Sequence, residues 1–367
     1  MELKHLFTDK IRELSDKVPF ISPESIEREL GTKFLLRVGA NESNFGASPN
    51  VVLAMQNAVK RIHQYSDPEA VELRELLGEK FGMNLKSIAL GSGIDDLLGL
   101  FVRLFVGSRE KVVTSLGCYP TFNYHVNGYG GDLHMVPYVC DKEDLLGLAD
   151  VANSENAKMV YLVNPDNPMG TWHEKEALAE FVNKIPPTCI LLIDEAYADF
   201  APANALLNPK KTPENVIHLR TFSKAYGMAG ARIGYALCHE DICLGLDKIR
   251  NHFGVNRIAQ AGAIATFEDE FYVNEVLKEV AQGKKFYENL AHDLGFSVVK
   301  SATNFIAMDM GSKERAKELS LELVKRRVFV RMPNVSPLDR CIRITIGPKD
   351  ERYKVAEAIR NSMSGIL

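Results

Sequence analysis

The sequence of 367 residues lacks the features that mark membrane, secreted and nucleic-acid-binding proteins. No apolar run reaches the roughly 20 residues that span a bilayer. The start of the chain, from Met1 to His5, does not have the charged-then-apolar pattern of a secretion signal. The formal net charge is −4 and the lysines and arginines are scattered, which argues against a nucleic-acid-binding surface. We therefore expect neither a membrane nor a nucleic acid among the partners.

Cysteine is scarce, and its spacing indicates neither a disulfide framework nor a metal site. None of the six cysteines forms a Cys-x-x-Cys pair, and most lie in apolar surroundings. We expect buried, reduced thiols, no metal, and a cytoplasmic protein. The pattern Gly-x-x-x-x-Gly-Lys-Ser/Thr is absent as well, which excludes a P-loop phosphotransferase.

What the sequence does contain is typical of a globular α/β protein. With 46% hydrophobic and 25% charged residues, the chain is long enough to form two domains. Strand-like runs alternate with helical patterns, which predicts βαβ units and a doubly wound, mainly parallel sheet. The strand-like runs cover residues 86–90, 111–114, 133–138, 159–163, 190–193, 216–219 and 233–237.

The two ends of the chain predict a second, smaller α+β domain. A long helical stretch around 257–293 comes first, and strand-like runs at 296–299, 304–308, 328–331 and 341–346 follow, with a helix at 312–326. Residues 50–82 look helical, whereas residues 1–40 look polar and irregular apart from a strand at 34–38. We expect residues 1–40 to form an N-terminal arm and part of the small domain, residues 41–265 the large domain, and residues 266–367 the rest of the small domain.

Residues 221–234 are the most informative segment. Lys224 lies between small and hydroxyl residues, directly after the apolar run 216–219. A lysine held at a strand end has room beside it for a flat cofactor, and its amine can condense with an aldehyde to form a Schiff base. Arg232 follows among glycines and can clamp a phosphate with its planar fork of donors. A glycine-rich turn with an incidental lysine and arginine is the alternative, and this segment alone does not decide.

Two upstream segments favour the cofactor site. Asp194 ends an apolar run that reads as a buried parallel strand, and ligands bind at the carboxyl ends of such strands. A carboxylate there can pair with a protonated pyridine nitrogen, and Tyr197 can donate to a ring phenolate. Asn167 follows the apolar run 159–163 in a turn that two prolines make rigid.

Taken in order, the three segments resemble a known family. Asn-Pro-x-Asn-Pro-x-Gly, Asp-Glu-Ala-Tyr and Ser-Lys-Ala-Tyr-Gly-x-Ala-Gly-x-Arg-x-Gly resemble the fold-type I pyridoxal-phosphate-dependent aminotransferases, and among them the histidinol-phosphate aminotransferases. The likeness runs from about residue 39 to residue 347. It implies pyridoxal 5′-phosphate as cofactor, catalytic roles for Lys224, Asp194 and Tyr197, and cofactor contacts from these three and from Asn167, Ser223 and Arg232.

A second phosphate contact is expected at a strand–turn–helix segment, residues 88–98. The backbone N–H groups of Gly93, Ile94 and Asp95 would form the anion site at the helix N-terminus. An ordinary tight turn is the alternative. Ile94 stands where family members often carry a small residue, so a hydroxyl contact is lost there.

The resemblance also assigns two aromatic residues. Phe122, two residues after a proline, would stack on the cofactor ring, and a plain core aromatic is the alternative. Tyr65 resembles the family tyrosine that reaches across a dimer interface to the partner's cofactor phosphate. It therefore implies a homodimer, although Ser66 replaces the usual proline after it.

Two arginines and one loop are expected on the substrate side. Arg331 and Arg343 lie in strand-like runs, where a cation needs an anionic partner or solvent. Arg343 resembles the family's carboxylate-binding arginine, and both are placed to hold a substrate phosphate, although a surface role for Arg331 stays open. Asn41 belongs to a loop that resembles Ala-Asn-Glu-Asn-Pro-x-Gly, but Ser43 and Asn44 replace its Asn-Pro, which leaves the substrate open.

The predicted function is an aminotransferase that uses a Schiff base on Lys224. The expected amino donor is histidinol phosphate or a related imidazole or aromatic amine, the acceptor is 2-oxoglutarate, and the pathway is histidine biosynthesis. An aromatic amino acid aminotransferase and a threonine-phosphate-type decarboxylase remain alternatives, because such relatives differ mostly in substrate loops. A non-enzymatic pyridoxal-phosphate-binding regulator is disfavoured, since the arm is short and not basic.

Overall fold

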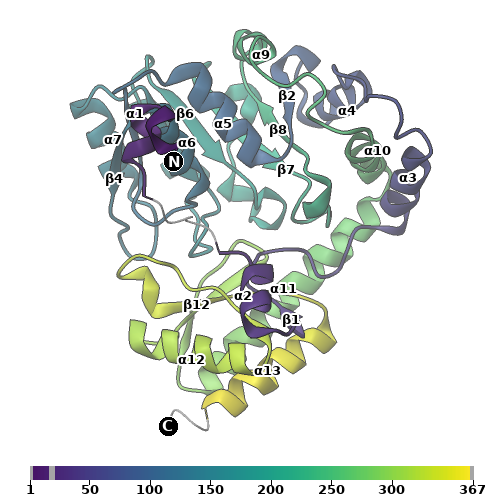
Figure 1. Ribbon diagram of the computed structural model, residues 1–367, viewed down its shortest axis with the longest axis vertical. Coiled ribbons are helices and arrows are strands. Elements are labelled where there is room, and N and C mark those ends of the chain that lie inside the picture. The colour runs from purple at the N-terminus through teal and green to yellow at the C-terminus, as the bar shows by residue number, and fades with distance from the viewer. Residues whose placement is uncertain (1–2, 16–20, 364–367) are drawn as a thin grey trace.

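The computed structural model describes residues 3–15 and 21–363 of the chain. Its main feature is a sheet of seven strands, above a smaller sheet of three (Figure 1). In spatial order the large sheet contains β2 (Ile88–Gly91), β8 (Gly234–Leu237), β7 (Val216–Thr221), β6 (Ile190–Asp194), β5 (Met159–Val163), β3 (Lys111–Ser115) and β4 (Asp132–Val136). β8 runs in the direction opposite to the other six strands of this sheet, which are parallel to one another. The predicted mainly parallel α/β sheet is therefore confirmed.

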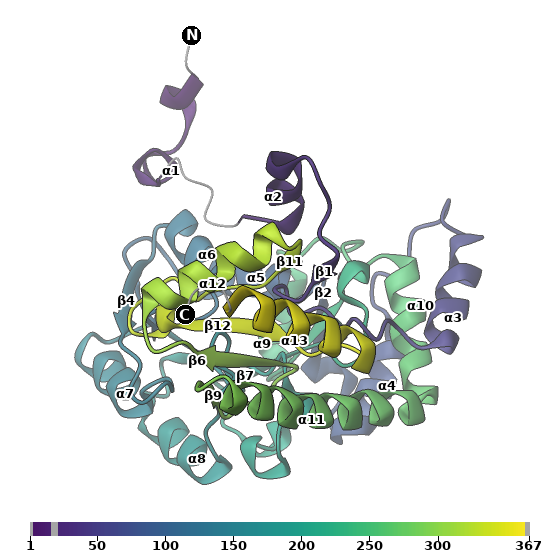
Figure 2. The same ribbon diagram turned by 90° about the horizontal axis from the view of Figure 1, so that it is seen from below.

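The smaller sheets come from the ends of the chain. The three-stranded sheet contains β12 (Cys341–Thr345), β10 (Phe305–Asp309) and β9 (Ser297–Val299), and a parallel pair joins β1 (Leu36–Arg37) to β11 (Val328–Phe329). Figure 2 shows α11, α12 and α13 around this part of the molecule. One apolar core holds it together, because Val38 from the N-terminal segment packs there with buried residues from Val276 to Met363.

Helices cover both faces of the large sheet. The α-helices are α1 (Asp9–Glu13), α2 (Pro23–Leu30), α3 (Pro49–Val59), α4 (Val71–Phe81), α5 (Ile94–Phe105), α6 (Thr121–Tyr129), α7 (Leu145–Ser154), α8 (Lys175–Lys184), α9 (Glu240–Asp247), α10 (Arg257–Ala265), α11 (Glu270–Asp293), α12 (Lys313–Lys325) and α13 (Lys349–Met363). Short 3-10 helices are η1 (Leu3–Leu6), η2 (Leu85–Ser87), η3 (Ala198–Phe200), η4 (Ala203–Ala205), η5 (Pro209–Lys211), η6 (Ala229–Ala231), η7 (Thr266–Glu268) and η8 (Leu338–Arg340). Among the described residues, no helix combines the length and apolar character needed to cross a membrane.

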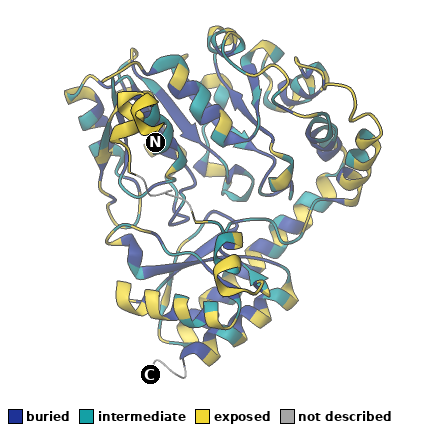
Figure 3. Cartoon of the chain, in the orientation of Figure 1, coloured by how far each residue is buried: buried dark blue, intermediate teal, exposed yellow. Residues whose placement is uncertain are grey.

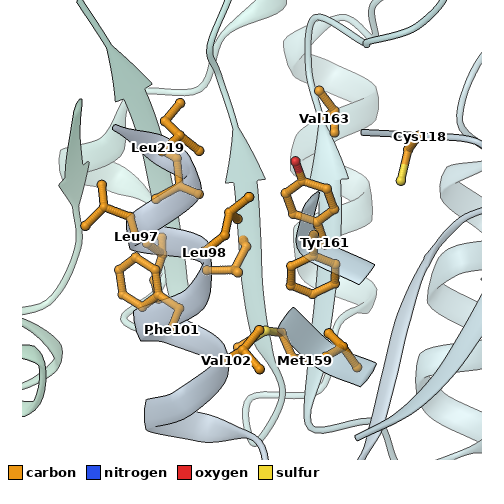
Figure 4. Packing of buried hydrophobic residues seen from close by; sticks show 14 of the residues in the cluster. Leu97, Leu98, Phe101, Val102, Cys118, Met159, Tyr161, Val163 and Leu219 are labelled. Carbon is orange, nitrogen blue, oxygen red and sulfur yellow. The ribbon is translucent and has the colours of Figure 1, made fainter. Parts of the chain in front are cut away.

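The alternation of buried side chains along β5 decides which helices lie on which face. Tyr161 packs with α5 and α6 on one face, whereas Val160 and Leu162 pack with α7 and α8 on the other. Figure 4 shows the α5 side chain Leu98 on the side of the helix toward Tyr161, with Leu97 and Phe101 farther from it. Each such fully buried apolar side chain contributes roughly 1.5–3 kcal/mol, so the helices are fixed firmly against the sheet. The central strands of the large sheet are buried, whereas the outer surfaces of the helices and many loops carry the exposed residues (Figure 3).

Three local predictions need correction. The stretch 257–293 is two helices, because α10 ends at Ala265, η7 intervenes, and α11 begins at Glu270 after Asp269, whose backbone (φ −129°, ψ 43°) is not helical. Residues 50–82 also form two helices, α3 and α4. The segment 1–40 is not irregular throughout, since Ser22 caps α2 and Pro23 opens it. Residues 1–2, 16–20 and 364–367, at the predicted arm and C-terminal end, lie outside the described residues.

Candidate active site

Adjacent parallel strands bring the central predicted residues together. Asn167 follows β5, Asp194 ends β6 and Lys224 follows β7, and these strands are neighbours in the sheet. The register pairs Val163 with Asp194 and Asp194 with Leu219, so all three segments leave the sheet at one edge. The site therefore lies where open α/β sheets bind ligands.

Lys224 is half-buried, and no acidic side chain of the described residues is in contact with it. Its Nζ donates to the carbonyl oxygen of Asn41 at 3.1 Å and lies 5.7 Å from the centre of the Tyr197 ring. Burial, together with the positive charge of Arg343, lowers the pKa of Lys224 to about 8. At a given pH, a larger fraction of this amine is therefore in the neutral, nucleophilic form than is the case for a surface lysine.

Asp194 is a buried acid whose contacts in the described chain are all neutral. Its Oδ2 accepts a hydrogen bond from the Tyr161 hydroxyl at 2.8 Å, and Oδ1 accepts from the Ala196 N–H at 3.0 Å. Burial raises the pKa of Asp194 to about 6, although these hydrogen bonds oppose the shift. A cation placed against this carboxylate would offset the cost of burying it.

Tyr197 and Asn167 form a polar pair beside the lysine. The buried Tyr197 hydroxyl accepts from Asn41 Nδ2 at 2.8 Å and lies 3.4 Å from Asn167 Nδ2. Burial raises the pKa of Tyr197 to about 12, so the phenol stays protonated and can donate. Asn167 Oδ1 in turn accepts from Arg343 Nη1, which connects the pair to the arginines.

The glycine turn before α5 and the segment after β7 face each other. Gly93 has φ +91°, and a Cβ at this position would lie only 2.4 Å from Nη2 of Arg232. Arg232 also donates to the Ala229 carbonyl at 3.0 Å and lies 3.5 Å from the Asp95 carboxylate. The first N–H groups of α5, which starts at Ile94, have no partners within the helix, so this corner offers an anion both donors and a cation. The buried Ser223 lies close by, two residues after the end of β7.

Arg343 is a buried cation without a carboxylate partner in the described chain. Nη2 donates to the Gly39 carbonyl at 3.3 Å, while Nε makes no hydrogen bond. Burial and the nearby charge of Arg331 lower the pKa of Arg343 to about 10. The backbones of Arg331 and Arg343 pair in an isolated antiparallel β-bridge. An anionic group bound there would compensate two cations at once.

The aromatic prediction is not supported by the position of Phe122. This side chain is fully buried in the core, where its ring stacks on Tyr161 at 4.4 Å. Tyr119 instead is partly exposed, and its hydroxyl donates to Asp95 Oδ1 at 2.8 Å beside the turn before α5. Tyr119 precedes α6, which begins at Thr121, whereas Phe122 lies in the first turn of that helix on its buried face.

Tyr65 lies away from this cluster, in the turn between α3 and α4. It is 78% exposed, and its ring stacks on Phe253 at 4.5 Å. The described chain therefore presents this side chain at its surface, next to further exposed apolar residues of α3 and the turn, namely Val52, Leu53, Val59 and Ile62.

Two further polar residues at the site were not predicted. Asn304 donates from Nδ2 to the Asn41 carbonyl at 3.2 Å, and Thr345 accepts from the Asn41 N–H at 3.0 Å. Both lie in or beside strands of the small sheet, and a lone polar residue in a strand carries no signal in a single sequence. The Tyr161 contact with Asp194 was missed for the same reason.

This fold with this set of side chains defines a fold-type I pyridoxal-phosphate enzyme. The model of the family "Aminotransferase class I and II" matches residues 33–359, and the chain belongs to that family. The family resemblance predicted from the sequence is confirmed.

Several relatives cover nearly the whole chain. A histidinol-phosphate aminotransferase 2 from Carboxydothermus hydrogenoformans is 35% identical over 346 residues, covering 92% of this chain and 93% of its own. A histidinol-phosphate aminotransferase from Moorella thermoacetica is 31% identical over 97% of this chain and 92% of its own. The crystal structure of histidinol-phosphate aminotransferase from Sinorhizobium meliloti in complex with pyridoxal-5′-phosphate is 45% identical, covers 98% of both chains and superimposes with a TM-score of 0.95.

The residues of this chain fit that cofactor. The buried Asp194 carboxylate lacks the cation that a protonated pyridine nitrogen supplies, and the turn at Gly93 leaves no room for a side chain beside Arg232. Lys224, with its lowered pKa, suits an aldehyde.

Proposed function

We propose that this protein is a pyridoxal-phosphate-dependent aminotransferase that transfers the amino group of histidinol phosphate to 2-oxoglutarate in histidine biosynthesis. One observation carries the choice of an anionic substrate: Arg343 is buried beside Arg331, its Nε makes no hydrogen bond, and its Nη1 donates to Asn167 of the Asn167–Tyr197 pair. The names of the relatives at 31–45% identity support the choice of histidinol phosphate.

When bound, the cofactor supplies an electron sink. It accepts the electron pair that remains on the substrate's α-carbon after that carbon has lost its proton. The Asp194 carboxylate holds the proton on the ring nitrogen. Asn167 and the Tyr197 hydroxyl hold the ring oxygen. The amine of Lys224 would take the substrate's α-proton in its neutral form and later return it, and a pKa lowered to about 8 makes that form more accessible than it is for a surface lysine.

The remaining predicted residues hold phosphate and substrate. The N–H groups at Gly93, Ile94 and Asp95, with Ser223 and Arg232, hold the cofactor phosphate. Tyr119, rather than Phe122, covers the ring, because it is the aromatic side chain at the edge of the site.

On the substrate side, Arg331 and Arg343 bind the substrate's anionic group, and Asn41 lines the pocket. Two planar, charged forks can bind a phosphate or a carboxylate bidentately. The same pair therefore serves both the phosphate donor and the 2-oxo acid that follows it.

We further propose a homodimer in which Tyr65 reaches the partner's site. The exposed apolar residues of α3 and of the turn that contains Tyr65 support this assembly, because exposed apolar side chains that gather on one face are typical of interfaces. The core of residues 276–363 with Val38 supports the expected division of the chain, in which residues 1–40 form an N-terminal arm and part of the small domain, residues 41–265 the large domain, and residues 266–367 the rest of the small domain. All six cysteines are free, which favours a reducing, cytoplasmic location.

Reductive trapping tests the chemical part of the proposal. Borohydride treatment of the protein loaded with pyridoxal phosphate should attach one cofactor per chain, and peptide mapping should find it on Lys224. A Lys224→Ala variant should show no attachment. Label on another lysine of the wild-type protein would contradict the assignment.

A further inference from the structure

The loop between β1 and α3 departs from the family pattern at Ser43 and Asn44, and the structure shows what replaces the proline. Nδ2 of Asn44 lies 2.9 Å from both carboxylate oxygens of Glu351, at the start of α13. The same amide lies 3.3 Å from the carbonyl oxygen of Arg37, at the end of β1. A side chain of this loop is therefore fixed to a helix more than 300 residues away in sequence.

The pocket for the Glu351 carboxylate is tightly shaped. A Cβ on Gly347 would lie 1.9 Å from Glu351 Oε1 and 3.4 Å from Cβ of Asn44, so only glycine leaves room for the contact. Burial raises the pKa of Glu351, whereas the hydrogen bond from Asn44 lowers it by stabilising the ionised form. The contact is a charge-assisted hydrogen bond in a half-buried place, which is stronger than a surface ion pair.

The loop that this contact holds carries Asn41, three residues earlier. Asn41 has a left-handed backbone, with φ +57°, and its Nδ2 donates to the Tyr197 hydroxyl. Its carbonyl accepts from Lys224 Nζ. A small shift of the loop would therefore change the hydrogen bonds of two catalytic side chains at once.

Both ends of the loop are anchored separately. Before Asn41, the Thr345 N–H donates to the Val38 carbonyl at 2.7 Å. After Asn44, the Tyr272 hydroxyl donates to the carbonyls of Phe45 and Gly46 at 2.8 and 3.1 Å. The stretch between these anchors has no proline to restrict its φ angles, so its position depends on side-chain contacts.

We propose that Asn44 and Glu351 form a clamp that positions Asn41 against Tyr197 and Lys224, and so serves as the chain's substitute for the family's rigid proline. This inference rests on the proposed function, in which Tyr197 and Lys224 act on the cofactor and the substrate. Asn44 and Glu351 are positioning residues, since neither touches the reacting groups.

Reversal of the clamp's polarity tests the proposal. Asn44→Asp keeps the shape but sets one carboxylate against another, and kcat/KM should fall by about 10-fold to 100-fold. Glu351→Gln in the same chain supplies an amide donor for the new carboxylate, so the double variant should recover most of the activity. Asn289→Asp, at an exposed position of α11, is the control for the change of charge and should match the wild type.

Two readouts separate positioning from mere stability. Hydrogen exchange of residues 39–46 in the cofactor-free protein should accelerate in Asn44→Asp and in Asn44→Ala, and return toward wild type in the double variant. The pH midpoint of the bound cofactor's absorbance change should shift in the same variants, because Asn41 donates to Tyr197. Exchange needs no substrate, so it tests the clamp even if histidinol phosphate proves inactive with the wild type.

A lowered melting temperature with wild-type exchange in this loop and an unmoved absorbance midpoint would overturn the proposal. A double variant no better than Asn44→Asp would overturn it too. If Asn44→Asp does not fold, Asn44→Ala gives the same two readouts without the added charge.

Discussion

Lys224 lies where its own charge is unfavourable. It is surrounded by a tyrosine ring, a backbone carbonyl and, at longer range, the cation Arg343, and its pKa falls to about 8. A buried ammonium of this kind costs folding free energy, which is recovered in function because the neutral amine reacts with aldehydes.

Because burial of the charged Lys224 side chain costs folding free energy, the free energy of unfolding should depend on pH. The folded chain releases the Lys224 proton near pH 8 and the unfolded chain near 10.5, so between these values the unfolded chain binds more protons and wild-type stability rises with pH. Cofactor-free Lys224→Met should therefore exceed wild type at neutral pH, by up to about 3 kcal/mol, with the gain shrinking toward pH 10. Denaturant unfolding of both proteins at the two pH values measures this. A variant less stable than wild type at neutral pH would contradict it.

Substitutions of Tyr119 and Phe122, on either side of Pro120, should have different effects on cofactor binding and on stability. Tyr119→Ala should weaken binding of pyridoxal phosphate by about 2-fold to 10-fold through loss of ring stacking, and leave stability nearly unchanged. Phe122→Leu should leave affinity unchanged and lower stability by about 1 kcal/mol, because it fills the core beside Tyr161. Cofactor titration by fluorescence and denaturant unfolding give both numbers. The opposite pattern would return the stacking role to Phe122.

For single residues, the sequence predicted the position in the site wherever the residue directly follows the end of a buried strand. Lys224, Asp194 and Asn167 come directly after apolar runs, and parallel neighbours necessarily present their carboxyl ends together. Phe122 shows the limit, because the sequence does not reveal which of two aromatic residues three positions apart, Tyr119 or Phe122, packs in the core at the start of α6. Asn304 shows another, because its contact with the loop spans more than 260 residues of sequence.

At the scale of elements, strands were more predictable than helix boundaries. Buried strands are short and almost wholly apolar, and β5 and β6 fall within one residue of the expected runs. The helical pattern through 257–293 has no proline to mark its break. The interruption after Ala265 therefore arises from packing, since Thr266 and Ala263 are buried and share a hydrogen bond there.

At the scale of the whole molecule, we expect the site of a single chain to be incomplete and both sites to be completed when two chains pair. Sedimentation should give a dimer of the 40.9 kDa chain. Tyr65→Ala and Lys224→Ala should each impair activity, and a mixture unfolded and refolded together should regain part of it, because hybrid dimers contain one intact site. A monomeric active protein, or a mixture without recovery, would contradict the crossing of Tyr65.

The identity of the amino donor can be tested directly with the bound cofactor as the reporter. Protein loaded with pyridoxal phosphate is mixed separately with histidinol phosphate and with phenylalanine, and the absorbance of the bound cofactor is followed. We expect fast conversion to the pyridoxamine form with histidinol phosphate and slower conversion with phenylalanine, because a phosphate offers the two cations Arg331 and Arg343 more negative charge than a carboxylate does. Conversion by phenylalanine alone would make the protein an aromatic aminotransferase. No conversion with either amine would contradict the histidinol-phosphate assignment outright.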